Sequence, residues 1–135
     1  MSDPSPRFRQ GMATRRKVLG DAYVDAAVAG TTAFNQDFQT LITESAWGTV
    51  WSRETISPRE RSMLTIALLA ALGHDEEVAM HVRATRQTGA SPGDIQEALL
   101  HVAIYAGVPA ANRAFKIAAK ALAETAPSEP EQGHA

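Results

Sequence analysis

Apolar residues recur three or four positions apart through most of this chain of 135 residues, which is the spacing of one face of a helix. Glycine, proline and short polar residues interrupt the pattern at points where helices typically begin or end. No stretch of useful length alternates apolar and polar residues as a strand does. The pattern predicts an all-α fold, a compact bundle of about six to seven helices. We expect helices over about residues 7–19, 21–29, 33–50, 58–72, 75–89, 91–106 and 109–124.

Several of these helices carry residues that favour a helix start. Residues 57–60, Ser-Pro-Arg-Glu, predict a capping box with proline in the first turn. Residues 91–94, Ser-Pro-Gly-Asp, are a second start of the same kind. Asp21 is expected to cap the short second helix, and Thr31 or Thr32 the third.

The segment from Met63 to Leu72 is apolar on nearly every side. A helix of this kind is buried at the centre of a protein or lies in an interface between subunits. We therefore expect one of these two positions for the helix over residues 58–72.

Bulk composition indicates one ordinary globular domain. The chain is 44% hydrophobic and 21% charged, and its length is that of a single domain. We predict one helical domain over residues 1–125 and a disordered tail over residues 126–135, which is rich in Pro, Glu and Gly. A net charge of −2 argues against a nucleic-acid partner. The isolated basic run at residues 15–17, Arg-Arg-Lys, is interpreted as a solvated helix face.

No segment predicts export or membrane insertion. The first residues lack the apolar stretch of a signal peptide, and the longest apolar run, Ile66 to Leu72, is too short to cross a bilayer. We expect no membrane partner and take the cytoplasm as the default location. The complete lack of cysteine fits that compartment.

The most informative polar cluster is formed by His74, Glu77 and His81. On a helix, these positions fall on one narrow stripe that carries two imidazoles and a carboxylate. Such a cluster can move protons or bind a metal ion such as zinc. The order differs from the H-E-x-x-H arrangement of zinc proteases. Without a thiol, disulfide and peroxide chemistry is excluded.

Several separate stretches resemble the carboxymuconolactone decarboxylase family, in the same order along the chain. They are residues 34–39 (FNQDFQ), 47–53 (WGTVWSR), 61–67 (RSMLTIA), 80–84 (MHVRA) and 101–110 (HVAIYAGVPA). The resemblance covers about residues 8–122. Alkylhydroperoxidase-type members of the wider family carry a C-x-x-C pair where this chain has His74 and Glu77. This departure points to the decarboxylase branch.

The resemblance implies an alkylhydroperoxidase D-like helical fold whose subunits form a ring, commonly a hexamer, with a trimer as the alternative. It implies conversion of γ-carboxymuconolactone, a dicarboxylate lactone, to β-ketoadipate enol-lactone and CO2 in the protocatechuate branch of aromatic catabolism. The lactone itself accepts the electrons of the broken bond. We therefore expect neither a cofactor nor a metal.

His81 and Glu77 are the predicted catalytic residues under this resemblance. An imidazole has an ordinary pKa near neutral pH, so His81 can donate a proton or stabilise the dienolate. Glu77, one turn earlier, can orient the ring and favour its charged form. Arg83 lies nearly opposite His81 on the same helix and is expected to serve a different subunit or an interface.

Five further residues are predicted to bind substrate. The guanidinium groups of Arg53 and Arg61, both in matching stretches, suit the two carboxylates. Trp51, His101 and Tyr105 can form the walls of the pocket, since the last two share a helix face.

Structural roles and other functions stay open. Glu77 and His81 can be a plain helix pair, His74 a loop histidine, His101 and Tyr105 buried and hydrogen-bonded residues. The alternative functions are a related lyase or isomerase on another small lactone or keto acid, and a non-catalytic helical oligomer that binds a small acid.

Overall fold

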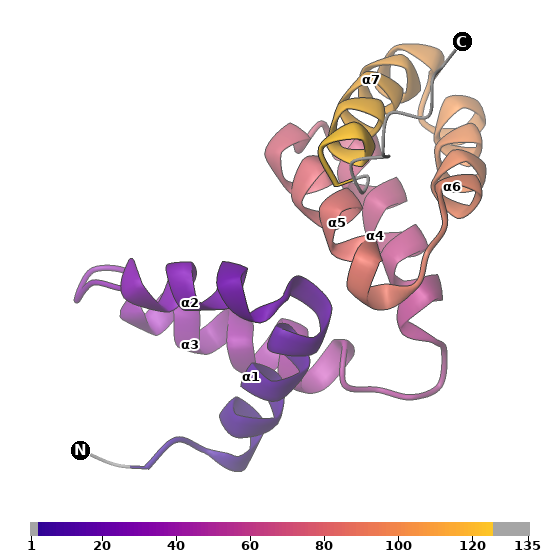
Figure 1. The fold of residues 1–135 in the computed structure, drawn as a ribbon. Coiled ribbons are helices and arrows are strands. Elements are labelled where there is room, and N and C mark those ends of the chain that lie inside the picture. Colours follow the sequence, from indigo (N-terminus) through magenta and orange to yellow (C-terminus); the bar gives the residue numbers. More distant parts are fainter. Residues whose placement is uncertain (1–2, 126–135) are drawn as a thin grey trace, which may run out of the picture. The chain divides into compact units, whose positions relative to one another are not determined.

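The computed structural model describes residues 3–125, and these residues form helices and connecting turns without any strand. The prediction of an all-α fold is confirmed. The helices are α1 (Pro6–Leu19), α2 (Asp21–Ala29), α3 (Gln36–Ile42), the π-helix η1 (Thr43–Val50), α4 (Pro58–Leu72), α5 (Asp75–Thr88), α6 (Pro92–Tyr105) and α7 (Val108–Thr125) (Figure 1). The predicted tail, residues 126–135, lies outside the described residues.

The described chain divides into two compact units. Unit 1 contains residues 3–61 and 87–89, and unit 2 contains residues 62–86 and 90–125. Helices α4 and α5 each contribute residues to both units. No helix in residues 3–125 is long and apolar enough to span a membrane.

Unit 1 is built on close backbone contact between α1 and η1. A Cβ atom added at Gly11 of α1 would lie 2.0 Å from the carbonyl oxygen of Thr43, which no side chain can occupy. A Cβ atom at Gly48 of η1 would lie 2.6 Å from the carbonyl oxygen of Arg7. The two glycines therefore let the helix backbones touch where side chains would normally separate them.

Two predicted caps in unit 1 are wrong. The third helix begins at Gln36, because Thr32 N–H donates to Asn35 Oδ1 at 2.8 Å and holds residues 32–35 in a turn. Asp21 is the first residue of α2, and its carboxylate pairs with Arg16 at 3.0 Å instead of capping the helix. The predicted helix over residues 33–50 is also not uniform, since it becomes a π-helix after Ile42.

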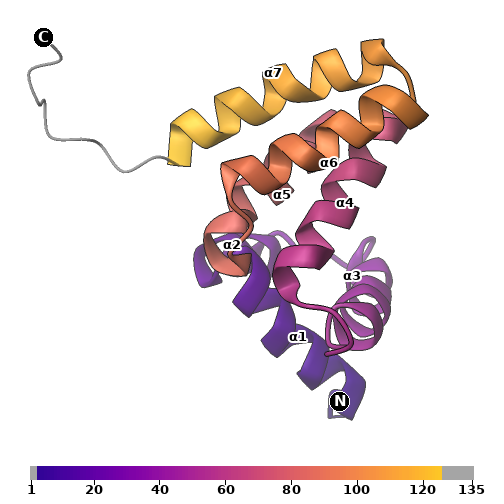
Figure 2. The ribbon, with the colours of Figure 1, turned by 90° about the vertical axis from the view of Figure 1, so that its right-hand side faces the viewer.

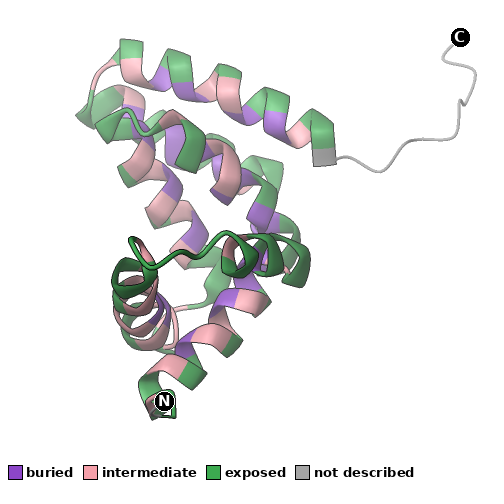
Figure 3. Ribbon diagram, turned by 90° about the vertical axis from the view of Figure 1, so that its left-hand side faces the viewer, coloured by how far each residue is buried: buried purple, intermediate pink, exposed green. Residues whose placement is uncertain are grey.

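Unit 2 has an apolar core. Its large buried side chains include Ile66, Val78, Val82 and Leu99. Helix α7 closes this core with a row of buried alanines and packs against α6 (Figure 2). The buried positions of α7 gather on one face of the helix (Figure 3). These small residues allow α7 to approach its neighbours closely. The row consists of Ala111, Ala114, Ala118 and Ala121.

Helix α4 has one buried and one exposed face. Ser62, Ile66 and Ala70 are buried, one turn apart. A row of leucines on α4 is 56 to 68% exposed, namely Leu64, Leu68 and Leu72. The helix thus forms part of the core of unit 2, while an apolar row remains uncovered in the single chain. At its start, Ser57 and Glu60 form the predicted capping box, with Glu60 N–H donating to Ser57 Oγ at 3.1 Å.

Candidate active site

His81 is buried in unit 2, with 7% of its surface exposed. It lies on α5, which starts after Gly73 in a left-handed conformation (φ 77°). The acidic first turn of α5 suits the positive end of the helix dipole. This start puts Glu77, which is exposed, one turn before His81.

Burial controls the charge of His81. It lowers the pKa of the imidazole from 6.5 to about 4, and the negative charge of Glu77 opposes this shift without reversing it. The prediction that Glu77 favours the charged ring is right in direction, but burial is the larger effect. The ring is therefore neutral at pH 7, and one of its nitrogens carries an N–H that can donate to a developing oxyanion.

His74 lies outside the buried part of the stripe. It is exposed in the turn before α5, where its backbone N–H donates to Leu69 O at 3.0 Å and its carbonyl accepts from Val78 N–H at 2.9 Å. This position fits the alternative of a loop histidine at a helix start. Across residues 3–125, no three His, Asp or Glu side chains come together in the arrangement of a metal site.

Arg53, Arg61 and Trp51 all belong to unit 1. Nη2 of Arg61 donates to the carbonyl oxygen of Arg53 at 3.0 Å, while the Nε–H of Arg61 is buried and has no acceptor among the described residues. The Trp51 ring lies 5.3 Å from that of Trp47, which is buried. Trp47 is thus a core residue.

A cavity of about 500 Å³ in unit 1 brings Trp51 and Arg53 together. Its walls also include Lys17, although the basic run at residues 15–17 predicts a solvated helix face. The ammonium group of Lys17 adds a second cation to the lining. Only the packing of α1 beside the loop after η1 identifies this residue as part of the cavity. The other lining residues are Gln10, Thr14, Val18, Ser52, Glu54, Ile56, Ser57, Pro58, Gln87 and Thr88.

His101 and Tyr105 lie on the surface of α6. Their rings stack with centroids 6.2 Å apart and planes inclined by 19°. Tyr105 is 85% exposed, and His101 is also exposed, with Nδ1 3.3 Å from the carbonyl oxygen of Glu97. The alternative that both are buried is wrong. They share a helix face as expected, and that face is open to solvent in the single chain.

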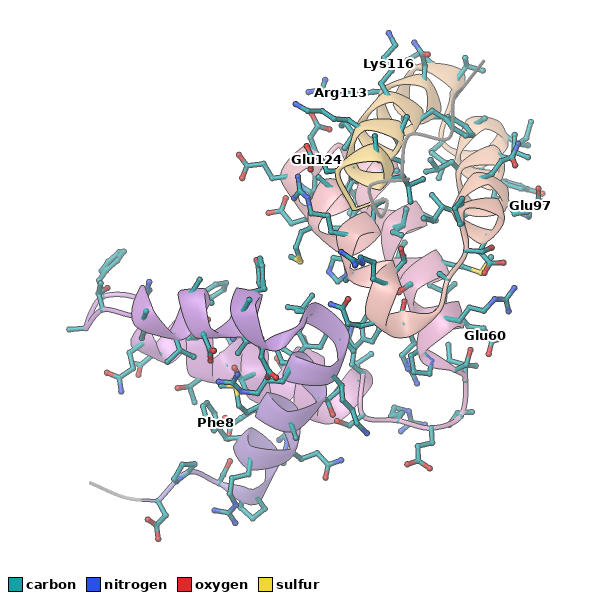
Figure 4. All side chains as sticks on the ribbon, in the orientation of Figure 1. Phe8, Glu60, Glu97, Arg113, Lys116 and Glu124 are labelled. Atoms are coloured by element: carbon teal, nitrogen blue, oxygen red, sulfur yellow. The ribbon has the colours of Figure 1, made fainter. Side chains whose placement is uncertain are left out.

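Arg83 does not need an interface to find a partner. Its Nε and Nη2 donate to Glu124 Oε2 at 3.1 and 2.9 Å, which links α5 to α7 within unit 2. Glu124 is labelled on α7 in Figure 4. The expectation that Arg83 serves a different subunit or an interface stays a prediction, and within the chain a helix residue 41 positions further along supplies a carboxylate.

Comparison with known proteins identifies the family of this chain. Residues 36–120 match the Carboxymuconolactone decarboxylase family. The chain belongs to this family. That match includes all of the candidate catalytic and substrate-binding residues.

Three relatives are similar to this chain over most of their own length. A 4-carboxymuconolactone decarboxylase from Acinetobacter baylyi is 43% identical over 112 residues, which cover 83% of this chain and 84% of the relative. Nitrosuccinic acid decarboxylase npaB from Metarhizium robertsii is 37% identical over 115 residues, 85% of this chain and 80% of the relative. A 4-carboxymuconolactone decarboxylase from Pseudomonas putida is 46% identical over 46 residues, which cover 34% of this chain and 96% of the relative.

Proposed function

We propose that this chain decarboxylates 4-carboxymuconolactone (γ-carboxymuconolactone) to β-ketoadipate enol-lactone and CO2, in the cytoplasm and in the protocatechuate branch of aromatic catabolism. The observation that carries this proposal is the 43% identity with the Acinetobacter baylyi enzyme over more than four fifths of both chains. The buried imidazole of His81, inside the matched region, supplies a group suited to the reaction.

The reaction has a simple electron balance. The bond between the γ-carbon and its carboxylate breaks, and CO2 leaves. The electron pair moves through the ring double bond to the lactone carbonyl oxygen, which gives a dienolate. A proton added at the α-carbon then forms the enol-lactone. The protein must hold a dianion and stabilise the charge that grows on the lactone oxygen, and one well-placed donor contributes about 3 kcal/mol to such stabilisation.

We assign the stabilising role to His81. Because the ring is neutral at pH 7, it is a hydrogen-bond donor to the lactone oxygen, and this supports dienolate stabilisation over proton donation by an imidazolium. Glu77 contributes through its charge, which offsets part of the effect of burial on the ring. A hydrogen-bond donor is most effective when it is buried, as His81 is, since few water molecules then compete with it for the oxyanion.

Arg53 and Arg61 are assigned to binding the dianionic substrate. Nη2 of Arg61 donates to the carbonyl oxygen of Arg53, which holds the two residues together, and guanidinium groups suit carboxylate oxygens. Trp51 provides an apolar wall beside Arg53 in the same cavity. An apolar wall suits the departing carboxylate, because tight ion pairing there would stabilise the substrate more than the transition state.

We further propose that the chain assembles into a ring, a hexamer with a trimer as the alternative. The exposed row of Leu64, Leu68 and Leu72 on α4 is one argument, since monomers seldom leave aligned apolar side chains uncovered. Ile104 and Tyr105 on α6, 77 and 85% exposed, are another. A second copy covering α6 would allow Tyr105 and its neighbours to act as pocket walls.

The assembly can be tested by sedimentation. Leu68→Glu places a charge in the leucine row and should dissociate the ring into smaller species. Lys116→Glu is the matched control, because Lys116 is exposed on α7 (Figure 4) and lies outside the leucine row. A wild-type chain that sediments as a monomer would contradict the proposal.

A second substrate is favoured by the similarity to nitrosuccinic acid decarboxylase npaB. Nitrosuccinic acid and carboxymuconolactone both carry two carboxylates and an internal electron sink, a nitro group in one and a lactone carbonyl in the other. A donor such as His81 can stabilise charge on either sink. Discrimination between the two substrates would therefore depend on the positions of the arginines.

The experiment that tests the proposed function measures CO2 release and enol-lactone formation. Freshly generated 4-carboxymuconolactone is added to purified, metal-chelated protein, and nitrosuccinic acid is assayed in parallel. Rapid turnover of the lactone is expected. Turnover of nitrosuccinic acid alone would replace the proposed substrate. Folded, assembled protein that acts on neither substrate would refute the proposed function.

A further inference from the structure

Arg15 departs from the interpretation of the basic run as a solvated face. It is only 6% exposed, on the side of α1 that faces the rest of unit 1. Its neighbour Arg16 is more exposed and pairs with Asp21 and Asp25 at 3.0 and 2.9 Å. In residues 3–125, no carboxylate pairs with Arg15 in this way. The structure therefore contains a buried cation without a counter-ion from the described chain.

The hydrogen bonds of Arg15 leave most of its donors unused. Nη1 donates to Gln39 Oε1 at 3.2 Å and to Thr43 Oγ1 at 3.4 Å. The Nε–H is buried and has no acceptor in the part of the chain described here. The acceptors that are present are a neutral amide and a hydroxyl, which do not balance the charge. Arginine stays protonated at neutral pH, so burial alone cannot remove that charge.

The groups around Arg15 are held in place. Thr43, which is 1% exposed, donates its hydroxyl to the carbonyl oxygen of Gln39 at 2.7 Å. Thr43 also belongs to the close contact between α1 and η1 at Gly11. The Nη1 side of the guanidinium is thus anchored to a rigid part of unit 1. Nε is enclosed by protein atoms, whereas Nη2 makes no hydrogen bond within the described residues and is not enclosed, so Nη2 is the donor left for a carboxylate.

Arg15 lines a cavity of about 360 Å³ that lies entirely within unit 1. Apolar side chains form part of the wall, among them Phe8, which is labelled in Figure 4. No aspartate or glutamate belongs to the lining. The volume is at the lower end of the range for small-molecule sites, which is about 300–1,000 Å³. The lining residues are Phe8, Met12, Arg15, Arg16, Val28, Thr31, Gln36, Gln39, Thr40 and Thr43.

We propose that this cavity binds a small organic acid, with one carboxylate on Arg15 and an apolar body about the size of a benzene ring against Phe8, Met12 and Val28. The carboxylate would supply the missing counter-ion and accept from the N–H groups of Nη2. The apolar walls favour a ring or short alkyl body over an inorganic anion, which has no surface to bury there. This site is additional to the residues assigned to decarboxylation and does not depend on that assignment.

Isothermal titration of the full chain with benzoate tests the proposal, with benzamide and inorganic phosphate as comparison probes. Benzamide has the same body without the charge, and phosphate has charge without the body. We expect benzoate to bind at least 10-fold more tightly than either. Equal binding of benzoate and benzamide would refute a role for Arg15, and tighter binding of phosphate would replace the proposed class of ligand with an inorganic anion.

Single substitutions test whether benzoate binds in the Arg15 cavity. Arg15→Met should weaken benzoate binding at least 10-fold, while Arg9→Met, an exposed arginine of the same helix, should leave it unchanged. Val28→Trp fills the cavity from its rim and retains Arg15. We expect this variant to lose benzoate binding, and that loss would support the proposal even if Arg15→Met does not fold. Arg61→Met should retain binding. If only Arg61→Met loses it, benzoate binds at the proposed catalytic arginines and the inference fails.

The remaining alternative is that a carboxylate from a second copy of the chain pairs with Arg15. In that case wild-type protein would not bind benzoate, and Arg15→Met would change the sedimentation coefficient. That combination of results would overturn the proposal.

Discussion

The two units of this protein bury ionisable groups with opposite consequences. In unit 2, His81 is 7% exposed, and burial lowers the pKa of the ring until it is neutral at pH 7. In unit 1, Arg15 is buried to a similar extent, beside the amide of Gln39 and the hydroxyl of Thr43. Burial lowers the pKa of the Arg15 guanidinium as well, but an arginine remains charged. Burial therefore produces a neutral hydrogen-bond donor in one unit and an unbalanced cation in the other.

The two units also differ in how their helices pack. Unit 1 depends on backbone contact at Gly11 and Gly48. Unit 2 depends on side-chain packing, and α7 fits because its buried positions are alanines. The difference implies that unit 1 is sensitive to a single added methyl group, whereas unit 2 is sensitive mainly to loss of aliphatic volume.

The largest expected effect concerns the neutral donor of unit 2. His81→Ala should reduce decarboxylation about 10²- to 10⁴-fold, because the dienolate loses a stabilising N–H. Steady-state kinetics with 4-carboxymuconolactone measure this loss. His74→Ala is the matched control on the same stripe, and it should stay within about two-fold of wild type, since His74 is exposed. A comparable loss of decarboxylation in both variants would contradict a catalytic role specific to His81.

Acid should destabilise the protein because His81 is buried as the neutral ring. Its pKa falls from 6.5 to about 4, which corresponds to a loss of up to about 3 kcal/mol of stability at low pH. The unfolded ring takes up a proton below pH 6.5 and the folded ring only near pH 4. Stability is therefore complete above pH 6.5, falls between pH 6.5 and 4, and levels off below. Urea unfolding at several pH values measures this slope.

His81→Leu should lose the part of the slope that His81 contributes. Arg15 contributes nothing in this window, because it stays protonated in both states. An unchanged slope in His81→Leu would show that other groups control the acid sensitivity.

Substitution of single glycines should separate the two modes of packing. Gly11→Ala should destabilise unit 1 by about 1–3 kcal/mol, because its Cβ meets backbone atoms of η1. Gly93→Ala in α6 is the matched control. The nearest atom to its Cβ is Ser91 Oγ at 3.6 Å, so alanine should be tolerated and add about 0.5 kcal/mol of helix propensity.

Hydrogen exchange locates the effect of the glycine substitutions. Amides of α1 and η1 should lose protection in Gly11→Ala, with a smaller effect on α6 and α7. Equal effects of the two substitutions would contradict the distinction between backbone packing and side-chain packing.

The smallest expected effect is at the surface of unit 2. Glu124→Gln breaks the ion pair with Arg83, but both side chains are more than 40% exposed, so we expect a loss of about 0.5 kcal/mol or less. A double-mutant cycle with Arg83→Met measures the coupling of the pair. A coupling well above 1 kcal/mol would mean that this link between α5 and α7 matters as much as the alanine packing of α7.

Local features of the chain were predictable because they depend on neighbours in sequence. The capping boxes at Ser57 and Ser91 form as expected, since a side chain needs only the amide three residues later. Most helix boundaries agree to within a few residues for the same reason. The predicted cap at Thr31 or Thr32 failed because Asn35 offers a competing local turn. The catalytic and substrate-binding roles of individual residues remain predictions.

The sequence by itself therefore determined the helical class, most helix boundaries, the family and the stripe that contains His81. Only the tertiary structure decided that η1 is a π-helix in contact with α1 at Gly11, that Arg15 is buried, and that Arg83 pairs with Glu124. It also decided the charge of His81. These properties depend on desolvation and on partners tens of residues away, and a periodic pattern of apolar positions contains neither.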